Sequence, residues 1–273
     1  MKSDGHNALP SRADAGPQRR RRIHDLLAAN GRMSVEELAA QLRVTAMTIR
    51  RDLDVLERDG LLLRVHGGCV PRTGSFVREL PFAEKAGQQV AEKQAIAQQV
   101  VGLLRPGESV YLDTGTTCAH VARRLPSERK LRVFTNNLRV AMDLCGRRDI
   151  EVHVFGGQLA ASSPDLLGTA AAVCAMQCRV DVAVVGADAV DPATAEFGAA
   201  DLETAALSRA VQRQAGRVIV VADNSKFGRI CRAVSGRLAE GVTLVTDAGV
   251  PPAQRRALAK TGARIVYAHA RGE

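Results

Sequence analysis

The fold of the front of the chain is decided by residues 19–70, RRRRIHDLLAANGRMSVEELAAQLRVTAMTIRRDLDVLERDGLLLRVHGGCV. Apolar residues at helical spacing over 23–27 are followed by an Asn-Gly pair, which favours the left-handed backbone that ends a helix. Ser34 then opens a Ser-x-x-Glu capping box with Glu37, in which each side chain bonds an otherwise unpaired amide. The pattern therefore predicts two short helices in succession, with the second beginning after Ser34.

A third helix is predicted after Thr45, a residue suited to cap a helix. Its apolar residues repeat at i, i+4 and i+7 and so face a core; they are Ile49, Leu53 and Leu56. At about 100° per residue, the opposite face carries Met47, Arg51, Asp54 and Arg58, with Arg50 on its flank. These features predict a helix-turn-helix whose third helix enters the major groove, the alternative being an ordinary three-helix bundle with a solvated face.

A two-stranded wing is predicted next, from an apolar run at 61–65, a Gly-Gly turn and a return at 69–70. Arg64 and His66 are placed at its tip, where they would contact phosphate or the minor groove, although a lone His there is more often a turn-stabilising polar group. The arginine run 19–22 favours a solvated helix start that would also touch phosphate near DNA. The candidate DNA-binding residues are Ser34, Thr45, Met47, Thr48, Arg50, Arg51, Arg58, Arg64 and His66.

Three stretches of this segment carry a specific resemblance: Val-Glu-Glu-Leu at 35–38, Met-Thr-Ile-Arg-Arg-Asp-Leu at 47–53 and Arg-Val-His-Gly-Gly at 64–68. Together they resemble the winged helix-turn-helix of the DeoR family of bacterial sugar-metabolism repressors. The resemblance implies a transcriptional regulator, in this family a repressor, whose partner is double-stranded operator DNA. Since one recognition helix spans few base pairs, a homo-oligomer reading repeated or inverted half-sites is expected.

Composition fits this interpretation. The chain of 273 residues is 46% hydrophobic and 25% charged, which is ordinary for a globular protein and excludes wholesale disorder. Its net charge of +9 favours a polyanionic partner, and residues 1–72 hold thirteen Lys or Arg against nine Asp or Glu. Aromatic residues make up 3% and Trp is absent, which argues against a base-stacking surface for single strands and against an RNA-binding protein.

Targeting and cysteine signals are also informative. No apolar run approaches the ~20 residues of a membrane-spanning helix, and residues 1–16 lack a signal-type apolar run, so we expect a cytoplasmic protein with no membrane partner. The six cysteines form no Cys-x-x-Cys pair, and Cys174 and Cys178 have no neighbouring His. We expect reduced, buried thiols, no metal site and no cofactor.

Beyond the wing, the sequence alternates short β-branched runs with helical segments, which predicts an α/β fold with a parallel sheet covered on both faces. The expected strands are 110–112, 131–134, 152–155, 180–185, 218–221, 242–245 and 265–267. The expected organisation is a disordered tail over 1–18, the winged helix-turn-helix over 19–72, a linker and connecting helix over 73–104, and a parallel-sheet domain over 105–270.

In an open parallel sheet, ligands bind at the carboxyl ends of the strands, and polar motifs follow these strands. Asp-Thr-Gly-Thr-Thr at 113–117 precedes a helix, where amides and hydroxyls would converge on an anion, an ordinary strand-to-helix turn being the alternative. Further motifs follow the other strands, at 135–137, 156–157, 186–188 and 223–228.

These motifs resemble the sugar-phosphate-sensing domain of the DeoR family, whose fold resembles ribose-5-phosphate isomerase. The resemblance implies a phosphorylated sugar or polyol effector, with phosphate and hydroxyl recognition by Asp113, Gly115, Thr116, Thr117 and Lys226. It places Asn136 and Gly157 along the pocket, and Asp188 and Glu203 at positions resembling an isomerase acid and base. Glu203 is equally suited to stabilise a helix start, and Thr204 and Ser208 depart from the family pattern.

The effector and the class of function each have an alternative. The run 135–138, Glu196-Phe197 in a predicted loop, and Thr-Asp-Ala at 246–248 followed by Pro251-Pro252 resemble the regulator type of the glycerol-3-phosphate regulon, although the other sugar phosphates taken together are favoured over this one effector. The competing function is an enzyme, either a sugar-phosphate isomerase or an acyl-CoA-type transferase with a basic front domain. A groove-reading helix and wing serve no catalytic purpose, so we expect a regulator without catalytic residues.

Overall fold

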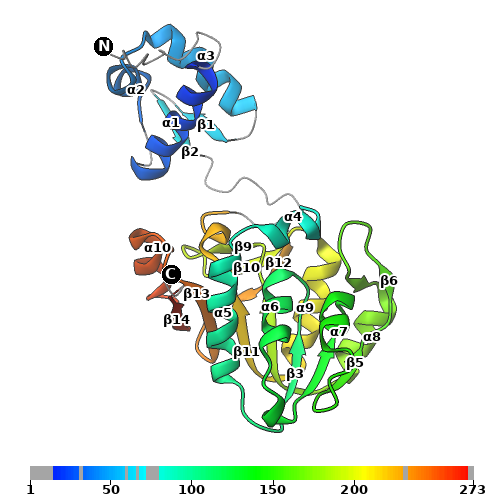
Figure 1. Ribbon diagram of the computed structural model, residues 1–273. Coiled ribbons are helices and arrows are strands. Elements are labelled where there is room, and N and C mark those ends of the chain that lie inside the picture. Colours follow the sequence, from blue (N-terminus) through cyan, green and yellow to red (C-terminus); the bar gives the residue numbers. More distant parts are fainter. Residues whose placement is uncertain are drawn as a thin grey trace, which may run out of the picture. The chain divides into compact units, whose positions relative to one another are not determined.

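The computed structural model describes residues 15–30, 33–58, 61–65, 68–71, 80–229 and 233–269. The chain divides into two compact units, Met1–Ser75 and Phe76–Glu273, and Figure 1 labels most of their elements. Within its described residues, the first unit contains three helices and an antiparallel pair of strands: α1 (Ala15–Asn30), α2 (Val35–Leu42), α3 (Ala46–Arg58), β1 (Leu62–Val65) and β2 (Gly68–Pro71).

Local signals in the sequence explain how the first unit forms. The Ser34 Oγ accepts from the Glu37 amide at 3.1 Å, and the Glu37 carboxylate accepts from the Ser34 amide at 2.7 Å, which completes the predicted capping box. The backbones of Met33 and Cys69 exchange hydrogen bonds of 2.8 and 3.0 Å, which tie the chain before α2 to the wing. A Cβ at Gly68 would lie 2.3 Å from the Met33 oxygen, so this approach requires glycine.

Two expectations for the start of the chain need correction. The helix α1 begins at Ala15, inside the predicted tail 1–18, while residues 1–14 lie outside the described part. Arg19 and Arg20 are not simply solvated, because their guanidinium groups lie 2.5 and 3.5 Å from the Asp52 carboxylate. Asp52 is buried in α3, so the arginine run joins α1 to α3.

The second unit is built on a parallel sheet of seven strands in the order β14-β13-β11-β8-β3-β4-β5. The strands are β3 (Ser109–Leu112), β4 (Arg132–Thr135), β5 (Glu151–Val154), β8 (Val180–Gly186), β11 (Ala215–Val221), β13 (Val242–Asp247) and β14 (Arg264–Ala268). Each corresponds to one predicted run, and all neighbouring pairs are parallel. The α/β prediction is therefore confirmed.

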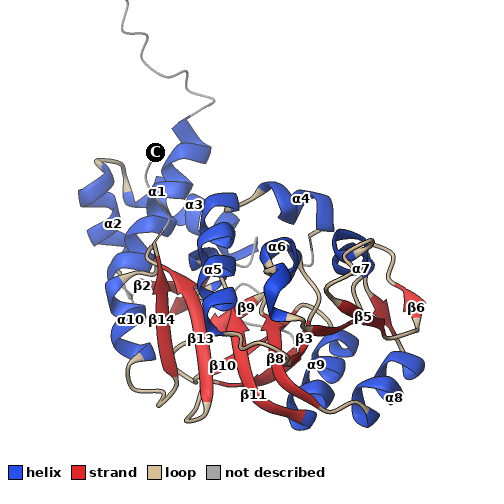
Figure 2. Cartoon of the chain, turned by 60° about the horizontal axis from the view of Figure 1, so that its bottom comes forward, coloured by secondary structure: helices blue, strands red, loops and turns tan. Residues whose placement is uncertain are grey.

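Helices cover both faces of this sheet (Figure 2). One face carries α5 (Val90–Leu103), α6 (Thr116–Arg124) and α7 (Leu138–Leu144), and the other carries α8 (Thr169–Gln177), α9 (Leu202–Gln214) and α10 (Pro252–Leu258). The strands β3 and β8 lie between the two hydrophobic clusters and are therefore almost continuous apolar runs.

The predicted linker and connecting helix over 73–104 is different in the structure. Residues 80–104 contain two helices, α4 (Phe82–Gly87) and α5, while residues 72–79 lie outside the described part. Ile96 and Val100 of α5 are fully buried against the sheet, so α5 belongs to the core of the second unit. The apolar residues of α5 therefore pack in this core, and α5 is not a connecting helix between the two units.

Smaller sheets complete the second unit. An antiparallel sheet contains β9 (Ala189–Asp191), β10 (Glu196–Ala199) and β12 (Ala233–Arg237), and a hairpin pairs β6 (Gln158–Leu159) with β7 (Leu166–Leu167). Short 3-10 turns are η1 (Ser127–Arg129) and η2 (Asn224–Lys226). The segment Glu196-Phe197 is thus a strand and not the predicted loop, because the fully buried Phe197 ring anchors β10 in the core.

None of the described helices combines the length and apolar character needed to cross a bilayer. No group of three or more His, Cys, Asp or Glu side chains in this part of the chain is placed to hold a metal ion. The described cysteines are free thiols. Cys69 and Cys118 are buried as expected, whereas Cys174 and Cys178 are half-buried and Cys145 is exposed. Cys231 lies outside the described residues.

Candidate functional site

The outward face of α3 is the first candidate site. Ile49 and Leu53 are buried, which turns Arg50 and Arg51 to solvent and leaves Met47 58% exposed. Arg58 is exposed on the same helix. The helix therefore offers a polar, basic surface opposite its apolar stripe, as its periodicity predicts.

The residues predicted at the helix starts have structural partners. The Thr45 Oγ1 accepts from the Thr48 amide at 3.2 Å and lies 2.9 Å from the Thr48 hydroxyl, so Thr45 caps α3. Thr45 is exposed, and Ser34 is half-buried within its capping box. Their contacts with DNA remain predictions.

Arg64 does not lie at the tip of the wing, as predicted, but within β1. Its Nη2 donates to the Asp54 Oδ1 at 2.5 Å and to the Arg50 carbonyl at 2.7 Å, and its Nε lies 3.7 Å from the Glu57 carboxylate. Arg64 therefore binds the wing to α3, because the strand register carries it beside that helix. His66 lies outside the described residues.

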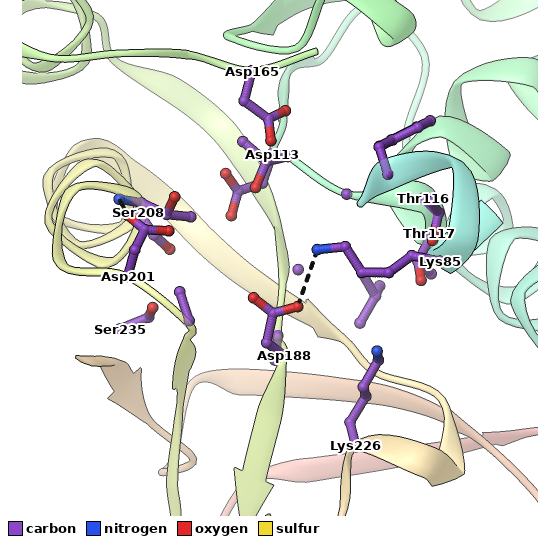
Figure 3. A pocket seen from close by; sticks show the side chains of 18 residues that line it. Lys85, Asp113, Thr116, Thr117, Asp165, Asp188, Asp201, Ser208, Lys226 and Ser235 are labelled. Carbon is purple, nitrogen blue, oxygen red and sulfur yellow. Dashed lines mark hydrogen bonds and ion pairs between the residues drawn. The ribbon is translucent and has the colours of Figure 1, made fainter. Parts of the chain in front are cut away.

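A pocket lies at the carboxyl ends of the central strands (Figure 3). The loop after β3, the loop after β8, α4, the start of α9 and η2 all contribute to it. Its polar lining residues are Lys85, Asp113, Thr114, Thr116, Thr117, Asp165, Asp188, Asp201, Thr204, Ser208, Lys226 and Ser235. The topological expectation that these loops converge holds for the loops after β3, β8 and β11.

One part of this pocket suits an anion. The helix α6 starts at Thr116 after Gly115, whose φ of 95° favours glycine, and none of the described side chains caps its first amides. Thr116 and Thr117, which carry hydroxyl groups, line the pocket, and Lys226 adds an ammonium group. Burial lowers the pKa of Lys226, while the Asp223 charge raises it. A phosphate would gain helix amides, hydroxyls and a cation here.

Another part of the pocket is rich in carboxyl groups. Burial raises the pKa of Asp113 to about 7, and its Oδ1 lies 3.1 Å from the Tyr111 hydroxyl oxygen. Burial also raises the pKa of Asp165, whose Oδ1 accepts from the Asn137 amide group at 2.6 Å. Figure 3 shows Asp201 and Ser208 across the pocket from Lys85. These oxygens are suited to accept hydrogen bonds from ligand hydroxyls.

Three predicted pocket residues do not line it. Asn136 is fully buried, where it accepts from the Tyr111 hydroxyl at 2.7 Å and donates to the Leu166 carbonyl at 3.0 Å. Gly157 serves packing, because a Cβ there would lie 2.4 Å from the Leu167 oxygen. Glu203 is exposed to solvent in the first turn of α9.

Other pocket residues escaped the sequence analysis. Asp201 takes the place expected for Glu203, and its Oδ1 accepts from the Thr204 amide at 2.8 Å as the N-cap of α9. The cap pattern two residues before Glu203 was a usable signal. No sequence signal pointed to Lys85 or Asp165 as pocket residues, because only the tertiary fold brings α4 and the β6–β7 hairpin to the pocket.

Two family models match this chain. Residues 19–73 match the DeoR-like helix-turn-helix domain, and residues 88–248 match the DeoR C terminal sensor domain. The second match alone spans more than half of the chain.

Curated relatives are similar over most of their lengths. The HTH-type transcriptional repressor CsqR of Escherichia coli (strain K12) is 36% identical over 84% of this chain and 86% of its own. The glycerol-3-phosphate regulon repressor of the same organism is 33% identical over 86% of this chain and 92% of its own. The HTH-type transcriptional regulator GlpR of Haloferax volcanii is 34% identical over 93% of this chain and 98% of its own.

A solved structure with a similar arrangement is the ribose 5-phosphate isomerase A of Methanocaldococcus jannaschii. It is 20% identical, the match spans 50% of this chain and 53% of the isomerase, and the TM-score is 0.37. A likeness at this level carries no argument about function.

Proposed function

The chain belongs to the DeoR family of transcriptional regulators, and we propose that its effector is a phosphorylated sugar or polyol bound in the pocket at the ends of β3 and β8. In this proposal it represses a carbohydrate or polyol catabolic operon and is released from operator DNA by that effector. Its named relatives are transcriptional repressors and regulators, so the chain is a regulator and not an enzyme.

The observation that supports this effector class is the mixed chemistry of one pocket. The uncapped start of α6, the hydroxyls of Thr116 and Thr117 and the Lys226 ammonium suit a phosphate. Asp113 and Asp201 provide oxygens for hydroxyl groups. An unphosphorylated sugar would leave the cationic part unused, and inorganic phosphate would leave the carboxyl groups unused. A phosphorylated hydroxy compound uses both.

Release from DNA requires that the effector bind one arrangement of the protein better than another. A coupling free energy of ~1–3 kcal/mol between the two sites would change operator affinity roughly 5- to 150-fold. The effector need not contact DNA for this.

The experiment measures both binding events on the full-length protein. A thermal-shift panel of phosphorylated sugars and polyols comes first, since a ligand at 100 times its Kd adds ~2.7 kcal/mol of stability. Glycerol 3-phosphate leads the panel because a relative at 33% identity is named for that regulon. Each stabilising compound is then titrated against complexes with a DNA site selected from a random library. We expect a phosphorylated member to lower DNA affinity, whereas its unphosphorylated counterpart has no effect. A panel without any stabilising member would overturn the effector class.

A further inference from the structure

Lys85 and Asp188 form an ion pair inside the pocket, drawn as a dashed line in Figure 3. The Lys85 Nζ lies 3.5 Å from the Asp188 Oδ1, and the two side chains are 14% and 23% exposed. The second Asp188 oxygen accepts from the Ala200 amide at 3.2 Å, which leaves the carboxylate held in place when Lys85 moves. The 3.5 Å separation is longer than a good charge-assisted hydrogen bond.

The backbone that carries Lys85 is held at both ends. The Phe82 amide at the start of α4 donates to the Ser162 carbonyl at 3.0 Å. At the other end, the buried Lys93 ammonium donates to the Lys85 carbonyl at 2.5 Å and to the Gln88 carbonyl at 2.6 Å. Only the side chain of Lys85 is therefore free to change partner.

The turn after α4 is also bonded to the loop that carries Lys226. The Gln89 Nε2 donates to the Asn224 Oδ1 at 3.1 Å, and Asn224 and Lys226 belong to the same short turn, η2. Asn224 in turn donates to Asp247 at 2.6 Å from its backbone and 2.7 Å from its side chain. The two lysines thus stand on bonded neighbouring segments, which limits how far their ammonium groups separate.

We propose that Lys85 is a second cationic effector contact, and that the anionic group of the effector replaces Asp188 as its partner. This inference rests on the proposed function, since it assigns a residue to the same pocket. A phosphate dianion attracts an ammonium more strongly than one carboxylate does, and ion pairs between partly exposed side chains are weak. The exchange therefore favours the bound state. Asp188, once released, accepts a hydroxyl of the same ligand.

The exchange also selects for ligand class. An uncharged sugar offers nothing that would compensate for separating Lys85 from Asp188. A ligand with a phosphate near a hydroxyl satisfies both side chains at once, the ammonium by the phosphate and the carboxylate by the hydroxyl. The Lys85–Asp188 ion pair thus disfavours the binding of unphosphorylated analogues of the effector.

The test uses the full-length protein and isothermal titration with glycerol 3-phosphate and ribose 5-phosphate, with glycerol and ribose as uncharged counterparts. We expect Lys85→Met to raise the Kd of the phosphorylated ligand by about 10- to 100-fold. Asp188→Asn keeps an acceptor oxygen for the Ala200 amide and an NH2 group for the ligand hydroxyl, while it removes the charge that competes for Lys85. We therefore expect it to lower that Kd by about 2- to 10-fold. Lys260→Met, at an exposed lysine outside the pocket, is the matched control.

The two variants act in opposite directions, so a folding defect in one does not decide the outcome. A Lys85→Met protein that melts normally and binds within twofold of the natural protein overturns the inference, as does unchanged or weaker binding by Asp188→Asn. If Lys85→Met has no effect but Lys226→Met weakens binding in the same series, the inference about Lys85 fails while the proposed function survives. If the natural protein binds neither phosphorylated compound, the proposed function fails for these ligands, and the exchange fails with it.

Discussion

Arg64 in the wing and Asp54 in α3 form an ion pair with 2.5 Å between Nη2 and Oδ1. The same nitrogen donates to the Arg50 carbonyl at 2.7 Å, and the Arg64 amide donates to the Glu57 carboxylate at 3.2 Å. These bonds connect the strand β1 directly to the helix that we expect to enter the major groove. Arg64 therefore positions the wing against α3, whereas Arg51 is exposed on that helix and is the residue that we expect to contact DNA.

The first prediction concerns Arg51→Ala. Arg51 is exposed opposite the buried Ile49 and Leu53, so we expect operator affinity to fall by ~1–3 kcal/mol if it makes a bidentate base contact. The melting temperature should hardly change. Fluorescence anisotropy with the selected DNA site measures the effect. Arg148→Ala, at an exposed arginine of the second unit, controls for the loss of one positive charge. Equal affinities for Arg51→Ala and Arg148→Ala would remove Arg51 from the interface.

The second prediction concerns Arg64→Ala, which should act mainly on stability. Exposed ion pairs contribute about 0–1 kcal/mol, and the bond to the Arg50 carbonyl contributes about 1 kcal/mol more. Thermal unfolding of Arg64→Ala, Asp54→Ala and the double variant forms a cycle that isolates the pair. We expect a coupling of up to ~1 kcal/mol, smaller at high salt. Strictly additive single effects would show that the contact contributes nothing.

The third prediction concerns Lys226→Met and the response to effector. Lys226 lies in the pocket near the uncapped start of α6, so losing its charge should raise the effector concentration needed for release from DNA by ~10- to 100-fold. The measurement is the midpoint of effector titrations against the protein–DNA complex, with Lys260→Met as control. An unchanged midpoint would mean that the phosphate binds elsewhere.

The fourth prediction concerns pH. Burial raises the pKa of Asp113 to about 7 from an ordinary value of 3.8. Between about pH 4 and pH 7 the unfolded chain loses this proton while the folded chain keeps it, so the free energy of unfolding falls as pH rises, by at most ~4 kcal/mol. Above pH 7 the contribution levels off. Asp113→Asn should lack this decline, which denaturant titrations from pH 4 to pH 8 would show. Parallel curves for the two proteins would contradict the prediction.

The fifth prediction concerns assembly. One helix-turn-helix of this size reads too few base pairs for regulatory specificity, so we expect a homo-oligomer that binds repeated or inverted half-sites. Sedimentation velocity at micromolar concentration, with and without a two-site DNA, measures it. A monomer under both conditions would rule the assembly out.

Local chemistry in the sequence was enough to predict much of the fold. The capping box of Ser34 and Glu37 depends on residues three apart, and the two faces of α3 follow from its 3.6-residue period. The seven parallel strands were predictable because strands buried on both faces are short β-branched runs. Each of these features depends on neighbours along the chain.

The composition of the pocket was decided by the tertiary structure. Asp201 and Glu203 are two residues apart, yet the extended backbone of the cap, with φ of −131° and ψ of 160°, places Asp201 at the pocket while Glu203 faces solvent. Lys85 and Asp188 form an ion pair although about a hundred residues separate them in the sequence. The periodicity of a helix or strand relates only residues that are close in sequence, so it could not predict this contact. The sequence alone determined which loops end at the sheet edge. Only packing decided which of their side chains point into the same space, because that depends on how helices and hairpins distant in sequence lie against the sheet.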